Sequence, residues 1–355
     1  MIDSFSEVGQ NVYHCILNKR MNTPARFLLS ILLAATLFAC KPDTYRYNEG
    51  TIFGTVYHLT YRADRDLQPA IEAELNRFDA ELSMFNPHST LSRFNVHDTT
   101  AFNLNGHPWV LRVIQKSLDY SALTNGAFDI TVAPLVNAWG FGFTESATVT
   151  QAYVDSLLDF VGYQRLRLRN GYLKKSDSRM QLDASAVAKG YACDVVADVL
   201  KKQGVQNYLI EIGGEMALKG KNPNGATWRI GINTPKDDST STNMEWMEKL
   251  TLTDRCVATS GNYRRFYIKD GKRYAHTINP HTGYPVQHSL LSATVIADDC
   301  LTADALATAF MVMGVEKAMV LAEKMPNVDA LFICAGDTGT LVVSGTSGMK
   351  RFQKK

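Results

Sequence analysis

Apolar residues recur along this chain with two different periods. Between Leu67 and Leu82 they stand three or four positions apart, which places them on one face of a helix. The same spacing predicts further helices over residues 110–122, 154–160, 184–202 and 301–324. Alternating or short apolar runs predict strands over residues 53–61, 208–212, 228–232, 250–258, 266–269, 292–297 and 329–334. Because strands and helices do not alternate strictly, the pattern predicts an α+β fold.

The N-terminal segment carries a targeting pattern. An apolar run over residues 27–38 follows several basic residues and ends just before Cys40. The run is too short to span a bilayer but fits the core of a signal peptide. A small residue followed by Cys at this place resembles a bacterial lipobox. We therefore expect residues 1–40 to be a signal peptide ending in a lipid-carrying Cys40. The alternative is a plain secretory signal with a coincidental Cys.

The remainder of the chain is expected to form a tether and one domain. Residues 1–20 are unlike the start of a signal peptide, which gives the hypothesis that translation begins at Met21. Residues 41–50 are polar and predict a tether, and residues 51–355 follow as the domain. A lipid anchor would hold this domain at a membrane of the bacterial cell envelope, facing the periplasm.

Composition narrows the class of protein. Of the 355 residues 45% are hydrophobic and 20% charged, with a formal net charge of +2, as in an ordinary globular protein. No basic block with interleaved aromatic residues occurs, so no nucleic-acid partner is expected. The six cysteines lack C-x-x-C spacing, which argues against a zinc site and a thioredoxin-type dithiol. Cys193 and Cys334 are expected as buried thiols, although export leaves disulfides open among Cys193, Cys256, Cys300 and Cys334.

The stretch YAHTINPHTGYPV, residues 274–286, concentrates several chemical groups in a short unit. His276 ends a strand-like segment, and Pro280, Gly283 and Pro285 follow as turn residues. An imidazole here can accept a proton near neutral pH, as a general base must. A single histidine beside a turn also fits a purely structural, hydrogen-bonded role.

Two oxygen-bearing residues follow on the next predicted helix. Asp304 and Thr308 stand one turn apart, so their side chains project from one face. A carboxylate and a hydroxyl suit a hard cation such as Mg²⁺. The simpler alternatives are a solvated first-turn acid for Asp304 and a hydroxyl bonded to the carbonyl four residues earlier for Thr308.

Together with GAFDITVAPLVNAWGFG (residues 126–142) and LDASAVAKGYACD (residues 182–194), these segments resemble the ApbE family. The resemblance runs from about Phe53 to the C-terminal region. Members of that family are Mg²⁺-dependent FAD:protein FMN transferases of the bacterial envelope. The resemblance thus implies an ApbE-like (T-fold-like) α+β fold, with two lobes and the flavin in a cleft between them.

Residue by residue, the resemblance implies a site for FAD and Mg²⁺. It implies His276 as the catalytic residue. It implies metal ligands at the Ala186 carbonyl, Asp304 and Thr308. It implies flavin contacts at Phe53, Phe85, Ala127, Phe128, Asp129, Asp183, Lys189 and Ile278. Core packing is the alternative role for the two phenylalanines, and a solvated helix position is the alternative for Lys189.

The chain also departs from the family pattern. Asn279 stands before Pro280 where the family usually has Asp, and we expect its amide to cap the turn without supplying a charge. Phe85 stands where Tyr is frequent, so a hydroxyl contact is lost. The pair Gly213-Gly214 ends a predicted strand and permits close backbone approach. No G-x-G-x-x-G fingerprint of a nicotinamide dehydrogenase is present.

Three functions remain open from the sequence. The leading hypothesis is transfer of FMN from FAD to a Thr or Ser hydroxyl of an acceptor protein, with AMP as the leaving group. The resemblance implies that the acceptor is an envelope-facing subunit of a redox complex. The first alternative is an FAD pyrophosphatase, in which water replaces the protein hydroxyl. The second is a non-enzymatic FAD-binding lipoprotein, which would not need an activating histidine.

Overall fold

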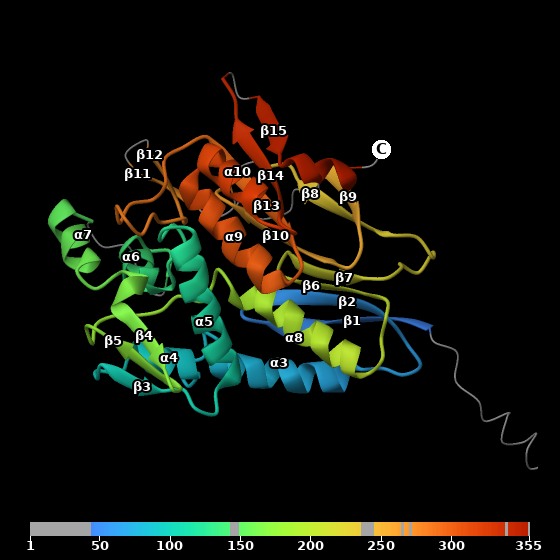
Figure 1. Ribbon diagram of the computed structural model, residues 1–355, viewed down its shortest axis with the longest axis horizontal. Helices are drawn as coiled ribbons and strands as arrows, with labels where there is room; N and C mark the ends of the chain where they lie inside the picture. The colour runs from blue at the N-terminus through green and yellow to red at the C-terminus, as the bar shows by residue number, and fades with distance from the viewer. Residues whose placement is uncertain are drawn as a thin grey trace, which may run out of the picture. The chain divides into compact units, whose positions relative to one another are not determined.

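The structure is a computed structural model that describes residues 44–142, 149–235, 245–263, 266–269, 272–337 and 340–353. Its largest element is an eight-stranded sheet in the order β1-β2-β6-β7-β10-β13-β14-β15 (Figure 1). Neighbouring strands from β2 to β15 run antiparallel. The strands are β1 Thr44–Ile52, β2 Thr55–Ala63, β6 Tyr208–Ile212, β7 Glu215–Lys219, β10 Arg255–Gly261, β13 Leu290–Ala297, β14 Asp329–Ala335 and β15 Leu341–Gly345.

Smaller sheets and helices complete the described fold and confirm the predicted α+β class. The remaining strands are β3 Ala101–Asn103, β4 Leu166–Arg169, β5 Tyr172–Lys175, β8 Trp228–Asn233, β9 Trp246–Leu252, β11 Phe266–Lys269 and β12 Lys272–Ala275. The α-helices are α3 Gln68–Leu82, α4 Thr90–Asn95, α5 Pro108–Leu123, α6 Ala133–Ala138, α7 Gln151–Leu158, α8 Ala188–Lys202, α9 Cys300–Met313 and α10 Val315–Lys324. The 3₁₀-helices are η1 Ile130–Val132, η2 Tyr163–Arg165 and η3 Ser347–Arg351.

Both faces of the central strands are buried, and successive residues alternate between two hydrophobic cores. In β13, Val295 and Ala297 belong to the larger core, which also contains residues of α8 and α9, whereas Ile296 belongs to the smaller core. In β14, Phe332 and Ile333 divide in the same way. The smaller core also contains residues of the β8–β9 hairpin. Burial on both faces explains why these strands form nearly continuous apolar runs in the sequence.

The tether predicted through residue 50 is wrong for its described part. Thr44–Ile52 forms β1, the edge strand beside β2. Two side-chain hydrogen bonds hold it in place: Tyr45 Oη donates to the Lys221 carbonyl at 2.6 Å, and Asn48 accepts from Oη of Tyr61 on β2 at 2.6 Å. Polar residues are common on an edge strand because one side of it faces solvent. The polarity of this segment therefore did not indicate a tether.

Two elements that were predicted as continuous are divided by residues with positive φ. The strand expected over residues 250–258 is the end of β9 and the start of β10, joined at Asp254 with φ +53°. The helix expected over residues 301–324 is α9 and α10, divided at Gly314 with φ +77°. Apolar periodicity continues across both breaks, because the elements on each side face buried surroundings.

The N-terminal predictions are largely outside the described residues. The signal peptide over residues 1–40, the lipid-carrying Cys40 and residues 41–43 of the predicted tether lie there. Among the helices of the described segments, none combines the length and the apolar character needed to cross a membrane. Cys193, Cys256, Cys300 and Cys334, which are all described, are free thiols.

Helices α8 and α9 make a close contact that positions several predicted site residues. A Cβ added at Gly190 would overlap the Cys300 carbonyl oxygen and lie 2.7 Å from Asp304 Cβ, so only glycine allows this approach. One turn further along α8, Asp194 accepts hydrogen bonds from the backbone N–H groups of Cys300 at 2.8 Å and Leu301 at 2.9 Å. Asp194 thereby satisfies free N–H groups at the start of α9 and fixes that end against α8.

We predict that Gly190→Ala destabilises the fold by about 1–3 kcal/mol through overpacking at this contact. Helix propensity alone would give the opposite sign, because Ala favours a helix interior by about 1 kcal/mol over Gly. Thermal or urea unfolding of the variant would measure the change. Lys202→Ala, an exposed change on the same helix, serves as the control and should stay within about 0.5 kcal/mol of the parent. A Gly190→Ala protein as stable as this control would contradict the steric argument.

Candidate active site

Asp304 lies where α9 meets the start of α8. Its side chain is buried, and its Oδ2 accepts a hydrogen bond from the Gly190 N–H at 2.9 Å. In an uninterrupted helix that N–H would donate to the carbonyl of Ala186, four residues earlier. Burial raises the pKa of Asp304, and the positive charge of Lys189 opposes that rise. Asp304 is therefore a buried carboxyl group, not the solvated first-turn acid of the simpler alternative.

Thr308 lies one turn further along α9, as predicted. Its hydroxyl is 3.1 Å from the Ser260 hydroxyl on β10, so its hydrogen-bond partner lies on the sheet. This contact does not support the alternative in which Thr308 bonds back to its own helix. Ser260 was missed in the sequence because a serine near the end of a predicted strand carries no distinctive signal.

Lys189 forms a buried ion pair that the sequence did not predict. Its Nζ lies 2.5 Å from Glu215 Oε1, and the Lys189 side chain is 30% exposed whereas that of Glu215 is 4% exposed. Burial acts to lower the pKa of Lys189, but the carboxyl groups of Glu215 and Asp304 outweigh it and raise the pKa. Lys189 is thus held as a cation within the site and is not a solvated helix residue.

His276 follows β12 and is half-buried. Its ring meets the Phe141 ring edge-on, with centroids 6.3 Å apart. The next residue, Thr277, donates from its hydroxyl to Asn262 Oδ1 at 2.6 Å. Asn262 lies two residues beyond Ser260, the partner of Thr308. Hydrogen bonds at the end of β10 therefore connect the His276 segment to the α9 residues.

The turn after His276 keeps its geometry with an asparagine. Asn279 Oδ1 accepts from the His281 N–H at 2.9 Å, and the Asn279 carbonyl accepts from the Gly283 N–H at 2.8 Å. Gly283 has φ +73°, which glycine adopts without strain. The expectation that the Asn279 amide caps the turn is confirmed. Ile278 is buried and pairs with Pro285 across this turn.

The segment of Ala127, Phe128 and Asp129 lies beside the same turn. The His281 ring nitrogen Nε2 is 2.8 Å from the Asn125 carbonyl. Asp129 is buried, and its carboxylate accepts from the Thr131 N–H at 2.9 Å and the Thr131 hydroxyl at 2.7 Å. It also accepts from a third donor, the N–H that begins η2, at 2.8 Å. Burial raises the pKa of Asp129, opposed by these hydrogen bonds. The Asp129 side chain thus shapes the segment itself.

Asp183 joins that segment to the start of α8. Its N–H donates to the Ile130 carbonyl at 2.7 Å, and its Oδ1 accepts from the Ser185 N–H at 2.8 Å. Ala186 follows directly, and Lys189 lies one helical turn after it. The motif of residues 182–194 therefore runs without a gap from the Asp129 segment to the Asp304 contact.

The two predicted aromatic contacts differ in burial. Phe53 stands at φ +52° between β1 and β2 and packs on Phe78, with ring centroids 5.6 Å apart. Phe85 is 64% exposed, and its ring lies 3.9 Å from the position of a Cβ added at Gly54. Phe53 therefore fits the core-packing alternative, whereas Phe85 offers an exposed aromatic ring. The neighbouring Thr55 lies close to Gly213, since a Cβ there would be 2.9 Å from Thr55 Cγ2.

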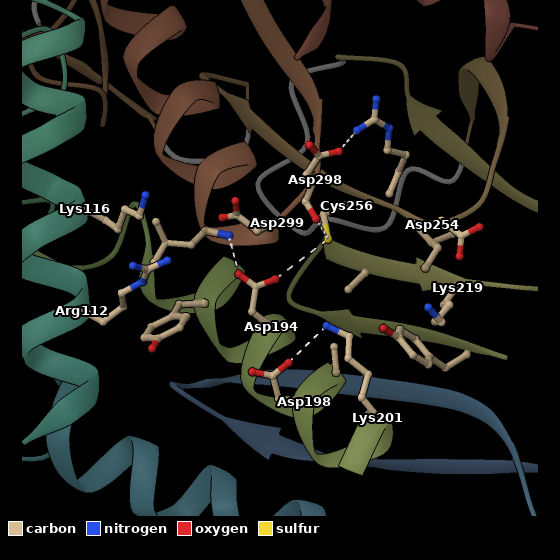
Figure 2. Close-up of a pocket in the computed structure, with 17 residues that line it drawn as sticks. Arg112, Lys116, Asp194, Asp198, Lys201, Lys219, Asp254, Cys256, Asp298 and Asp299 are labelled. Carbon is tan, nitrogen blue, oxygen red and sulfur yellow. Dashed lines mark hydrogen bonds and ion pairs between the residues drawn. The ribbon is translucent and has the colours of Figure 1, made fainter. Parts of the chain in front are cut away.

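These contacts join the predicted residues into one region, and a cavity between α5, α8 and the central sheet lies apart from it. That cavity, of about 420 Å³, contains none of the predicted site residues in its lining. Arg112 and Lys116 reach into it from α5, and Asp194, Asp198 and Lys201 from α8 (Figure 2). Charges of both signs line it, so it gives no clear preference for an anionic or a cationic ligand.

The donor chemistry of the predicted metal residues fits a hard cation. Asp304 supplies a carboxylate, Thr308 a hydroxyl and Ala186 a carbonyl, which are the oxygen ligands that Mg²⁺ prefers. No cluster of three or more His, Cys, Asp or Glu side chains suited to a metal occurs in the described part of the chain. The predicted set has a single carboxylate, so it differs in kind from such clusters.

A model of the ApbE family matches residues 53–332. A protein named FAD:protein FMN transferase from Vibrio cholerae is 38% identical over 321 residues, covering 88% of this chain and 93% of the relative. A protein of the same name from Haemophilus influenzae is 34% identical over 344 residues, covering 92% and 98%.

Solved structures agree with this assignment. The flavin transferase ApbE from Vibrio cholerae superposes with a TM-score of 0.78 at 36% identity, covering 88% of this chain and 100% of that one. The apo form of the Pseudomonas stutzeri flavinyl transferase ApbE gives a TM-score of 0.78 at 33% identity, covering 89% and 99%. The similarity extends over nearly the whole length of each relative. This chain therefore belongs to the ApbE family.

Proposed function

We propose that this protein is an FAD:protein FMN transferase. The family membership and the names of the relatives support the transfer of FMN from FAD to a protein. The observation that carries the proposal for this chain is the Asp304–Gly190 hydrogen bond of 2.9 Å. It brings a buried carboxylate to the segment that bears Ala186 and Lys189, so oxygen ligands and a cation lie together, as a bound pyrophosphate requires.

The residues of the candidate site would divide the binding of FAD and Mg²⁺ among them. Ala186, Asp304 and Thr308 would hold Mg²⁺, which neutralises phosphate charge when it is bound. Lys189 would add a fixed positive charge, and the exposed ring of Phe85 would pack on the flat isoalloxazine. The segment of Asp129 and the turn after His276 would shape the remaining wall of the site.

His276 is proposed as the general base. A Thr or Ser hydroxyl of the acceptor attacks the FMN phosphorus, and its proton passes to the imidazole. The new bond joins the acceptor oxygen to the FMN phosphate, while the bond between the two phosphates breaks and AMP leaves. The ring of Phe141 against the imidazole supports this role by restricting its orientation.

The place of the reaction is also a proposal. The targeting pattern at residues 27–40 supports a lipid-anchored protein of the bacterial envelope that modifies a redox-complex subunit. Mass spectrometry of the membrane fraction tests this anchor, because a diacylated Cys40 gives a defined mass increment. An unmodified mature protein that begins after a cleavage site would instead indicate a plain secretory signal.

The deciding experiment incubates the purified protein with FAD, Mg²⁺ and a Thr-bearing acceptor subunit from the same genome. We expect a fluorescent acceptor band on a denaturing gel with an equal amount of AMP by chromatography. AMP together with free FMN and no band would favour a pyrophosphatase. If FAD stays intact with this acceptor, the result would favour a flavin-binding lipoprotein.

We predict that Asp304→Ala lowers Mg²⁺-dependent turnover by about a hundredfold or more, because the only carboxylate of the predicted metal set is lost. Titration of activity with Mg²⁺ measures the effect, and the thermal unfolding transition in the absence of FAD shows whether the variant still folds. Glu316→Ala on α10 is the control and should behave like the parent. Unchanged Mg²⁺ dependence in the Asp304 variant would remove the metal assignment.

For His276→Ala we predict a fall of about 10²–10⁴-fold in the rate of transfer, the usual contribution of a general base. FAD binding should change little, since the proposed role concerns the acceptor proton. Single-turnover transfer and fluorescence titration with FAD separate the two quantities, with His88→Ala as an exposed control. Loss of FAD binding in parallel with transfer would make His276 a structural residue.

A further inference from the structure

Glu215 is a buried acid with an unusual set of partners. It is the first residue of β7 and follows the Gly213-Gly214 turn, whose φ values are +59° and +104°. The Glu215 backbone is fixed on two sides, by pairing with Ile212 across the hairpin and by the Cys193 thiol, which donates to the Glu215 carbonyl at 3.3 Å. The carboxyl group is therefore mounted on rigid backbone.

The two oxygens of that carboxyl group differ. Oε1 lies 2.5 Å from Lys189 Nζ, whereas the buried Oε2 has no hydrogen-bond partner within the described residues. An unpaired buried acceptor costs stability, and a buried ion pair is weak evidence for a stabilising role. Stability of the fold therefore does not account well for an acid at this position.

The position of Lys189 explains the acid at position 215 better than stability of the fold does. Its ammonium interacts with both Glu215 and Asp304, and its Cδ would be 3.2 Å from a Cβ added at Gly213. A lysine side chain has four flexible carbons and loses considerable rotamer freedom when it is fixed. An anchored partner removes that cost before the ligand arrives, so the cation binds more tightly than a mobile one would.

We propose that Glu215 is a positioning residue, which fixes the Lys189 ammonium at the place where the phosphates of FAD bind. The inference rests on the proposed function, since it takes the phosphate groups of FAD as the ligand of Lys189. Glu215 would act through Lys189, which it contacts, and not by contact with the reacting atoms. The Gly213-Gly214 turn contributes by letting the hairpin approach the Lys189 stem, which a side chain at Gly213 would obstruct.

Glu215→Ala tests the proposal with two ligands, FAD and riboflavin, which lacks phosphate. Fluorescence titration in Mg²⁺ without acceptor should show FAD binding weakened by about tenfold, the effect of one lost tethered contact. Riboflavin binding should be unchanged. Lys189→Ala should give the same pattern, and the double variant should bind FAD no more weakly than Lys189→Ala alone. Equal loss for both flavins, additive effects, or unchanged or tighter FAD binding would each overturn the proposal.

Two further variants keep the test informative. Glu215→Gln retains an acceptor oxygen for Lys189 at nearly the same volume, so it should fold and recover part of the FAD affinity. Glu74→Ala is the matched control, because Glu74 pairs with Arg77 at 2.8 Å on the surface of α3. It should leave both flavin affinities unchanged.

Assays of the wild-type protein distinguish a failure of the positioning role from a failure of the proposed function. If the wild type transfers FMN and Glu215→Ala binds FAD normally, the positioning role alone fails. If the wild type transfers no FMN while the phosphate-selective loss occurs, the positioning role stands and the proposed function fails.

Discussion

The contact between α8 and α9 is the constraint on which the candidate site depends. Two helix backbones approach so closely at Gly190 that its N–H reaches the Asp304 carboxylate, and a single Cβ would prevent this. Asp194 holds the start of α9 against α8 from the next turn. Because both helices also pack on the central sheet, the position of Asp304 relative to Ala186 is set by backbone and not by flexible side chains.

Burial of charge follows from that arrangement. Asp304 and Glu215 are buried beside Lys189, whose ammonium offsets the burial of both carboxyl groups, and the Gly190 N–H also donates to Asp304. Such groups are costly to bury and usually occur where chemistry requires them. The region gains rigidity from hairpins and tight turns, with positive φ at Gly213, Gly214 and Gly283.

A second line of contacts brings the histidine segment to the same region. Ser260 and Asn262, at the end of β10, contact Thr308 and Thr277 respectively. Ser260 and Asn262 lie at one strand end, although the chain between their partners includes the turn after His276, β13 and the first part of α9. A central antiparallel strand can make this connection because its neighbours bring distant parts of the chain to one edge.

The sequence by itself determined the α+β class, most of the described helices, about half of the described strands, and the main chemical candidates. Helical spacing located α3 and α5, and turn residues located the loop after His276, because these signals are local. The limits of β9, β10, α9 and α10 were less accurate, since buried elements remain apolar across a break. Only the tertiary structure decided that Lys189 pairs with Glu215 and that Thr308 meets Ser260. Those partners lie far apart in the chain, and their proximity depends on how the helices pack on the sheet, which no local pattern of residues encodes.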